Sequence, residues 1–224
     1  AKIMSKYDLE AIPVIDNKKQ LVGRITIDDI VDFIKEEAEE DYLLAAGVQG
    51  DVEADDSIIE LTKARLPWLF LGLIGGLGSV FILEGFEEVM SHPSYKTLFF
   101  FTPLIAAMAG NVGVQSSAII VQGLANNTLS GSVFNRLIKE VALSLLNGVI
   151  LATILFVGSH YLLNVEIIIG VIVTVALISV IIIASLIGTF IPLLLDKFGI
   201  DPALATGPFI TTSNDICGIL IYFS

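Results

Sequence analysis

Residues 167–195 read IIIGVIVTVALISVIIIASLIGTFIPLLL and carry no charged side chain. About 20 apolar residues are enough for a helix to cross the hydrocarbon core of a bilayer, so this stretch can span it even when tilted. The composition agrees, because 54% of the residues are hydrophobic and the mean hydropathy is +0.84. Both values exceed those of ordinary soluble domains. We therefore expect an all-α integral membrane protein.

Four further apolar segments accompany this one, and together they predict five transmembrane helices per chain. The expected spans are about 65–90, 97–125, 140–163, 167–195 and 201–224. Arg65 and Trp68 stand at the start of the first span, where interfacial anchors belong. A short polar turn, SHPSYK, precedes the second span.

Basic residues are distributed unevenly between the two ends of these spans. Five spans place the termini on opposite sides of the membrane, and only Lys96 falls on the C-terminal side. The basic residues on the N-terminal side are Lys63, Arg65, Arg136, Lys139 and Lys197. Because cytoplasmic loops carry an excess of Lys and Arg, we expect a multi-pass protein of the cell membrane. Its N-terminus would be cytoplasmic and its C-terminus outside.

The first 62 residues differ in charge from the rest of the chain. They hold 16 acidic and 6 basic residues, a net charge of −10, whereas the remaining residues contribute −2 to the total of −12. This acidic balance argues against nucleic-acid partners and favours cations.

The same acidic part shows the pattern of a small α/β unit. AIPVI (11–15) and LVGRIT (21–26) predict two strands, and an amphipathic helix begins near Ile27. We expect three parts. They are a partial α/β domain over 1–46, a linker or linking helix over 47–63, and the five-helix membrane domain over 64–224.

The last span carries one acidic residue, Asp215, which follows Asp201 by 14 positions. At about 1.5 Å per residue this is about 21 Å along a helix, past the middle of the bilayer. An ionisable side chain at this depth is costly and indicates a functional site. The alternative is a structural hydrogen bond or a carboxylate that reaches the interface. No lysine or arginine lies at a comparable depth, which favours a cation site.

The centre of the second span is also polar, reading AMAGNVGVQSS over 107–117. Gly110 and Gly113 allow another backbone to approach closely, while Asn111 and Gln115 are four residues apart and share a helix face. Polar groups at this depth must face protein or water. We expect this face to line a pore, the alternative being a helix contact built from small residues.

The fifth span opens with DPALATGPFITTSND over 201–215. Proline has no N–H and clashes with the preceding turn, so Gly207-Pro208 should interrupt the helix and turn carbonyls near Thr206–Thr211 toward the pore. Oxygen ligands of these kinds suit Mg²⁺, Ca²⁺ or Mn²⁺. The predicted metal ligands are Asp215, Asn111, Thr211 and Gly207, and the predicted pore-lining residues are Gly110, Gly113, Gln115, Pro208 and Thr212.

One carboxylate per chain cannot strip a divalent ion of its water. Mg²⁺ usually keeps several waters and takes one or two carboxylates, so a two-fold homodimer with two copies of Asp215 at its axis would hold a hydrated ion. Glu84, Glu87 and Glu88 end the first span at the outer interface. They either attract cations to an outer mouth or form a solvated helix end.

These motifs resemble the MgtE family of magnesium channels and transporters over nearly the whole chain. AGNVGVQSS, DPALATGPFITTSND and Phe86-Glu87 carry the resemblance, while AIPVID and GRITIDDI are similar to the second half of a CBS domain. The resemblance implies a homodimer in membrane lipid, with a central pore lined by the second and fifth helices and Mg²⁺ held at Asp215.

The resemblance also implies regulation from the cytoplasm. In that family, acidic domains and a linking helix close the pore when Mg²⁺ is plentiful, so Mg²⁺ is both transported and regulatory. The candidate sensor residues are then Asp28, Asp29, Asp32 and Glu36. The alternative for each of them is a solvated acidic helix face.

The function expected from these features is a Mg²⁺-selective channel for magnesium uptake, gated by intracellular Mg²⁺. The alternative is a coupled exchanger or exporter of Mg²⁺, Mn²⁺, Co²⁺ or Ca²⁺, since the same oxygen ligands serve all four ions. We do not expect an enzyme, because the sequence has neither H-E-x-x-H nor a nucleophile with a buried histidine.

Overall fold

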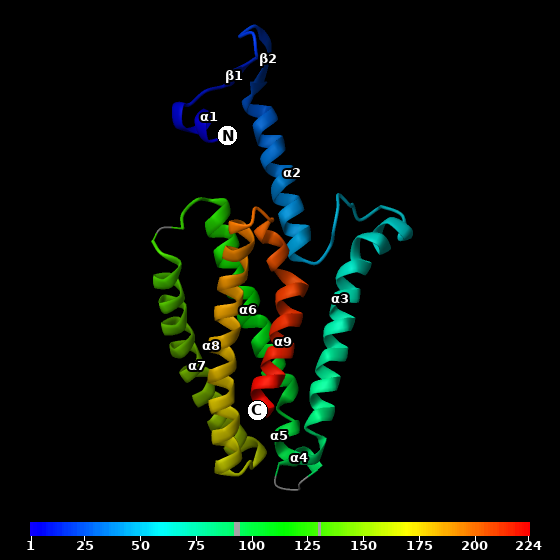
Figure 1. Ribbon diagram of the computed structural model, residues 1–224, viewed down its shortest axis with the longest axis vertical. Coiled ribbons are helices and arrows are strands. Elements are labelled where there is room, and N and C mark those ends of the chain that lie inside the picture. The colour runs from blue at the N-terminus through cyan, green and yellow to red at the C-terminus, as the bar shows by residue number, and fades with distance from the viewer. Residues whose placement is uncertain (92–94, 130) are drawn as a thin grey trace.

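The computed structural model describes residues 1–91, 95–129 and 131–224. A small N-terminal domain stands at one end of a helical bundle, and one helix, α2, leads from that domain to the bundle (Figure 1). Part of the turn expected before the second span, residues 92–94, lies outside the described residues.

The N-terminal domain contains the strand pair that the sequence predicts. Its elements are α1 (Lys2–Tyr7), β1 (Ala11–Ile15), β2 (Leu21–Thr26) and α2 (Ile27–Ala45). The strands are antiparallel, with Val14 opposite Gly23. Helix α2 begins with a capping box, in which the side chains of Thr26 and Asp29 each bond the other's backbone N–H. The prediction of a mostly helical chain with a small strand pair at its N-terminus is confirmed.

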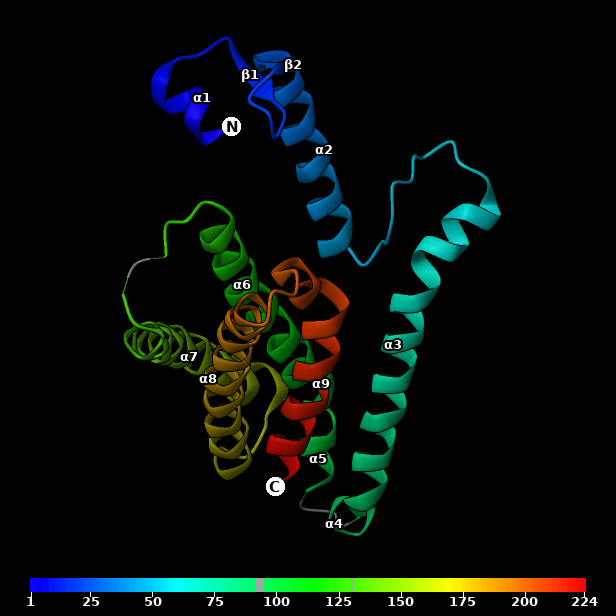
Figure 2. The same ribbon diagram turned by 45° about the horizontal axis from the view of Figure 1, so that its top comes forward.

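Five longer helices and three short ones follow. They are α3 (Ile58–Gly85), α4 (Glu87–Ser91), α5 (Lys96–Phe99), α6 (Thr102–Ala125), α7 (Val133–Leu163), α8 (Ile167–Lys197), the 3₁₀ helix η1 (Pro202–Ala205) and α9 (Gly207–Phe223). Within the described residues, α3, α6, α7 and α8 are long and apolar enough to cross a membrane. Helix α9 has 17 residues and runs beside α6 and α8 through the bundle (Figures 1 and 2).

Two of the helices begin earlier than the expected spans. Helix α3 starts at Ile58, where Ser57 and Glu60 form a capping box, and α7 starts at Val133, capped by Ser132. The sequence spans mark only the apolar part of each helix, whereas capped polar turns extend both helices beyond it.

The core lies where α6, α8 and α9 cross. Ile105 and Ala109 of α6 pack there against an apolar face of α8 that includes Val173 and Leu177. Helix α7 covers the far side of α8, and the hydroxyl of Ser144 donates to Ser185 at 2.6 Å between them. Helix α3 packs chiefly against α9 and stands apart from α7 and α8 (Figure 2).

The approach of α8 to α6 depends on a pair of glycines. A Cβ on Gly188 would overlap the carbonyl oxygen of Gly113 and lie 3.1 Å from its Cα. Backbone atoms cannot move aside as a flexible side chain can, so these two helices fit together only while position 188 has no side chain.

We predict that Gly188→Ala lowers the stability of the protein by about 1–3 kcal/mol, because overpacking forces α6 and α8 apart. Thermal unfolding in detergent measures the change. Gly158→Ala on α7 is the matched control, since a Cβ there has nothing within 4 Å. Equal unfolding temperatures for the two variants would contradict the close contact.

Candidate functional site

The chain changes direction between η1 and α9. Thr206 is extended, with φ −103° and ψ −178°, and Gly207 has a φ of +55°. Pro208 then lies in the first turn of α9, where its missing N–H has no helical partner to lose. The interruption expected at Gly207-Pro208 therefore lies at Thr206 and Gly207, and the regular helix follows from Pro208 onward.

One hydrogen bond from α6 and two local ones hold this break in place. The hydroxyl of Ser117 on α6 donates to the carbonyl of Ala205 at 2.7 Å, and the hydroxyl of Thr206 donates to Ala203 at 2.6 Å. The side chain of Asp201 caps η1 by accepting from the N–H of Ala203 at 2.9 Å. These bonds satisfy backbone groups that a continuous helix would have paired.

The end of α2 touches the start of α9 through two glycines. A Cβ on Gly207 would overlap the carbonyl oxygen of Ala45, and one on Gly47 would overlap the ring of Pro208. Both glycines have positive φ, +55° and +76°, which other residues rarely adopt. Helix α2 and the residues that follow it thus meet the break directly.

Asp215 lies eight residues into α9, about 12 Å along the helix axis from Gly207. The 21 Å expected from Asp201 assumed one continuous α-helix, whereas residues 202–205 form the 3₁₀ helix η1 and the chain changes direction before α9. The carboxylate lies against α6, where a Cβ on Gly110 would be 2.9 Å from its Oδ1 and 3.0 Å from Cγ2 of Thr211. Oδ1 is buried and has no hydrogen-bond partner in the part of the chain that the structure describes.

The structure therefore brings Asp215, Thr211 and Gly110 together. The hydroxyl of Thr211 donates to the carbonyl of Gly207 at 3.0 Å, so its oxygen keeps lone pairs for another donor or a cation. Gly207 lies at the break, two turns before Asp215 on α9. Metal binding by these residues stays a prediction.

The two amide side chains of α6 that the sequence assigns to the pore are not buried with Asp215. Asn111 and Gln115 are exposed on the outside of the single chain, whereas Gly110 and Gly113 beside them are buried. Lipid cannot satisfy amide groups in the hydrocarbon region, so this face requires water or more protein.

Thr212 turns away from α6. Its methyl group occupies the space beside Gly75 of α3, where a Cβ would overlap it. Pro208 is half-buried under the linker at Gly47. Within a single chain, these two predicted pore-lining residues contact α3 and the linker and lie apart from the α6 contact of Asp215.

Asn214 is the polar residue that the sequence reasoning passed over. Its side chain is 0% exposed and fills the space beside Gly113, and neither amide atom has a hydrogen-bond partner among the described residues. An unpaired buried polar group costs about 1–3 kcal/mol. The available signal was its place next to Asp215 in an apolar helix.

The predicted outer-mouth acids lie at the end of the bundle away from the N-terminal domain. Glu84, Glu87 and Glu88 are exposed at the end of α3 and the start of α4. The first two line a cavity of about 350 Å³ together with Val80, Leu83 and Phe99.

The predicted sensor residues on α2 fall into different surroundings. Asp28 and Asp32 are exposed. Asp29 accepts hydrogen bonds from the N–H and hydroxyl of Thr26, both at 2.7 Å, and these bonds lower the pKa of Asp29. Its carboxylate is therefore engaged in capping the helix.

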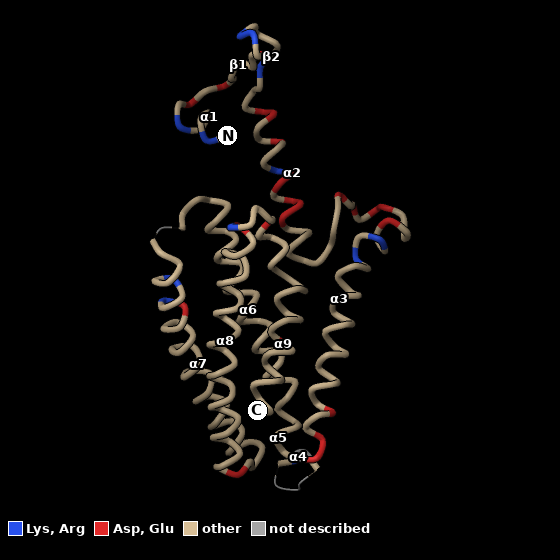
Figure 3. The backbone as a smooth tube through the Cα atoms, viewed as in Figure 1, with Lys and Arg blue, Asp and Glu red and all other residues tan. Residues whose placement is uncertain are grey.

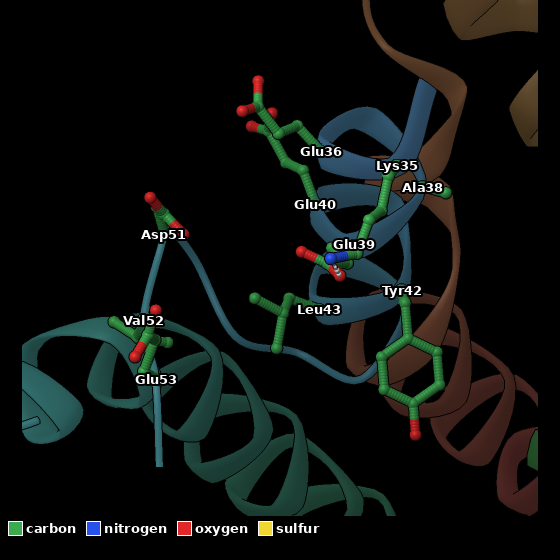
Figure 4. A pocket seen from close by; sticks show the side chains of 11 residues that line it. Lys35, Glu36, Ala38, Glu39, Glu40, Tyr42, Leu43, Asp51, Val52 and Glu53 are labelled. Atoms are coloured by element: carbon green, nitrogen blue, oxygen red, sulfur yellow. Dashed lines mark ion pairs between the residues drawn. The ribbon is translucent and has the colours of Figure 1, made fainter. Parts of the chain in front are cut away.

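Glu36 lines an acidic cavity between α2 and the segment that follows it. The cavity has a volume of about 630 Å³, and its other acidic residues are Glu39, Glu40, Asp51 and Glu53. Figure 4 shows these side chains on α2 and on the linker, with Lys35 paired to Glu39 at 3.7 Å. Of the four sensor candidates, only Glu36 is part of this cavity.

Two acidic residues also lie close together where α2 meets η1. Partial burial and the negative charges of Asp201 and Glu40 raise the pKa of Asp41 above its ordinary value of 3.8. Asp41 belongs to the end of α2 and Asp201 caps η1, so two like charges face each other beside the break.

The charge pattern follows the axis of the bundle (Figure 3). Basic residues of α3, α7 and α8 lie at the same end as the N-terminal domain. Over residues 1–91, 95–129 and 131–224, no three His, Cys, Asp or Glu side chains come together as a metal cluster. A cation at Asp215 would therefore have one carboxylate from each chain.

Two family models match the chain, and curated relatives match it over its whole length. The family model MgtE, described as a divalent cation transporter, matches residues 102–224, and a CBS domain model matches residues 1–36. The chain is 37% identical to the magnesium transporter MgtE of Bacillus subtilis (strain 168), 38% to that of Enterococcus faecalis and 35% to that of Thermus thermophilus. Each match covers 100% of this chain and 49–50% of the relative, so the chain spans about half their length.

We predict that the contact between α2 and η1 tightens as the pH falls. Ionised Asp41 opposes the contact, because the contact raises its pKa. This free-energy cost disappears when Asp41 is protonated, as the pH falls through the raised pKa toward the ordinary value of 3.8. Hydrogen exchange of residues 38–50, corrected for intrinsic rates, should show increasing protection at lower pH.

Asp41→Asn tests whether Asp41 causes this pH dependence of hydrogen exchange. The amide carries no charge at any pH, so this variant should show the higher protection already at neutral pH and little further change. The same pH dependence in wild type and variant would rule out Asp41 as its source.

Proposed function

The chain belongs to the MgtE family of divalent cation transporters, and from this membership we propose that it forms a Mg²⁺-selective channel for magnesium uptake. It is a multi-pass membrane protein of a transporter family and not an enzyme, as the sequence predicts. Mg²⁺ is proposed as the ion because the relatives that share half their length with this chain are named magnesium transporters.

The observation that carries the proposal is the position of Asp215. Its carboxylate lies between α9 and the glycines of α6, with one oxygen buried and without a protein partner among the described residues. A carboxylate in that state lacks the hydrogen bonds that a purely structural role would supply. A cation with its own water satisfies the charge and the lone pairs together.

A homodimer completes the site in this proposal. A single Asp215 leaves Mg²⁺ with one carboxylate, whereas two copies about a two-fold axis supply two while the ion keeps its water. The exposed amides Asn111 and Gln115 support this assembly, because a second copy and a water-filled pore between the copies would cover them.

The proposed orientation places the N-terminal domain in the cytoplasm. Basic residues at that end of α3, α7 and α8 support it through the excess of positive charge on cytoplasmic segments. The exposed acids Glu84, Glu87 and Glu88 then lie outside the cell, where they would raise the local concentration of cations at the entrance.

Closure by intracellular Mg²⁺ is the proposed regulation. The acids of α2 repel one another and Asp201 at low Mg²⁺, and a bound cation removes that repulsion and holds α2 against η1. The contact of Gly47 and Ala45 with the start of α9 supports transmission, because a shift of α2 moves against the break directly.

The exchanger alternative requires a second titratable group in the membrane part. Glu140 is the available residue, and it is half-buried and accepts a hydrogen bond from Ser116 at 2.6 Å. Currents through protein in planar bilayers, recorded without any H⁺ or Na⁺ gradient, distinguish the two functions. A channel conducts under these conditions, and a strictly coupled exchanger does not.

We predict that Asp215→Asn abolishes Mg²⁺ uptake, because the amide has the same shape but no charge to hold the ion. Uptake is measured as growth rescue of cells that lack other magnesium systems and as flux into proteoliposomes. Asp196→Asn, the same change at an exposed residue near the end of α8, should leave flux unchanged. Undiminished Mg²⁺ flux in Asp215→Asn would contradict the proposed function.

We predict that Asp201→Asn makes closure by Mg²⁺ easier, because it removes the charge that repels Asp41, while conduction at the lowest Mg²⁺ concentrations persists. Asparagine still caps η1, so the variant removes charge and keeps the fold. The Mg²⁺ concentration for half-closure should fall about tenfold, the effect of about 1.4 kcal/mol. Asp8→Asn in the N-terminal domain is the control, and an unchanged half-closing concentration in Asp201→Asn would exclude this contact from gating.

A further inference from the structure

Two consecutive residues of α9 lie on two glycines of α6. Asp215 lies against Gly110 and Asn214 against Gly113, which is one turn further along α6. The amide of Asn214 reaches into the space that a side chain at position 113 would fill, and its Cγ is 2.9 Å from that Cβ position. The two polar side chains therefore share one strip of the α6–α9 contact.

This strip concentrates the unpaired polar atoms of the membrane part. Six buried side-chain N and O atoms lack a hydrogen-bond partner within the described residues, and three of them belong to Asn214 and Asp215. Other buried polar side chains nearby are paired, such as Ser117 with Ala205 and Ser144 with Ser185. Half of the unpaired atoms thus lie in this one contact, whereas the others are single atoms of Trp68, Thr102 and Thr189.

Neither lipid nor a second copy of the chain can pair with Asn214. Its side chain is 0% exposed and is already enclosed where α9 meets α6, at the point where Gly188 of α8 also touches Gly113. Asp215 beside it is half-buried and reachable from outside the chain. A partner for Asn214 must be small and must enter along Asp215.

We infer that Asn214 is a further residue of the ion path. Its carboxamide accepts hydrogen bonds from, and donates hydrogen bonds to, the water that accompanies a divalent cation at Asp215. This inference rests on the proposed function of Asp215 and adds a specific role for its neighbour. Water is the chemistry that fits, because a carboxamide needs both a donor and an acceptor and a hydrated cation brings both. The α6–α9 contact parts by the width of a water molecule when the ion arrives.

Asn214→Leu separates this role from a structural one. Leucine is close in shape and apolar, so it removes the unpaired amide and should leave the unfolding temperature equal or higher. If the amide serves only packing, flux stays at the wild-type level. If the inference holds, Mg²⁺ flux into proteoliposomes falls about tenfold although the protein is at least as stable.

Thr102→Val is the matched control for this variant. Its hydroxyl is also buried and unpaired, but it lies eight residues before Gly110, about 12 Å along α6. The control should gain or keep stability and conduct normally. A fall in flux as large as that of Asn214→Leu would overturn the inference, because any isosteric loss of a buried polar atom would then reduce flux.

Asn214→Thr and Asn214→Val provide a second comparison in case leucine disturbs the fold. These two variants have the same shape and differ by one hydroxyl, so packing defects cancel between them. The threonine variant should conduct several-fold faster than the valine variant, and equal flux would refute the inference. Asp215→Asn is measured alongside, since normal flux in that variant would reject the proposed function itself.

Discussion

The close approach of α9 to α6 at two glycines is the contact on which the rest of the membrane part depends. Gly110 and Gly113 have no side chains, so Asp215 and Asn214 can lie directly against the α6 backbone. Inside a bilayer, helices gain little from apolar burial against one another, so close packing at small residues takes on that role. Larger residues at these two positions would separate the helices and remove the polar strip.

The break at Thr206 is the second feature that organises the structure. It divides the last membrane segment into η1, held by Ser117 of α6, and α9, which carries Asp215. The end of α2 lies on this break through Gly47 and Gly207. The acids of α2 and the carboxylate of Asp215 are thus joined by one short length of backbone.

The sequence predicted the elements better than their rotation. Apolar length identified the helices, alternating residues identified the strand pair, and the glycine and acid motifs identified Gly110 and Asp215, which the structure brings together. The sequence predicted less well which face of its helix each residue occupies. Thr212 lies against α3, and Asn214 is the buried polar residue, because rotation of α9 is set by packing against three neighbours that no local pattern describes. The exact bend at Thr206 also depends on a bond from α6, 88 residues away.

The contact between α2 and α9 has a consequence for how such sequences can diverge. It is made by backbone and proline atoms at Ala45, Gly47, Gly207 and Pro208, with no charged side chain among them. Under the proposed regulation, the acids that line α2 can therefore be added, lost or moved along the helix without changing this joint. The strength of the proposed Mg²⁺ response and the geometry of the joint are therefore set by different residues, the first by carboxylates and the second by two glycines and a proline.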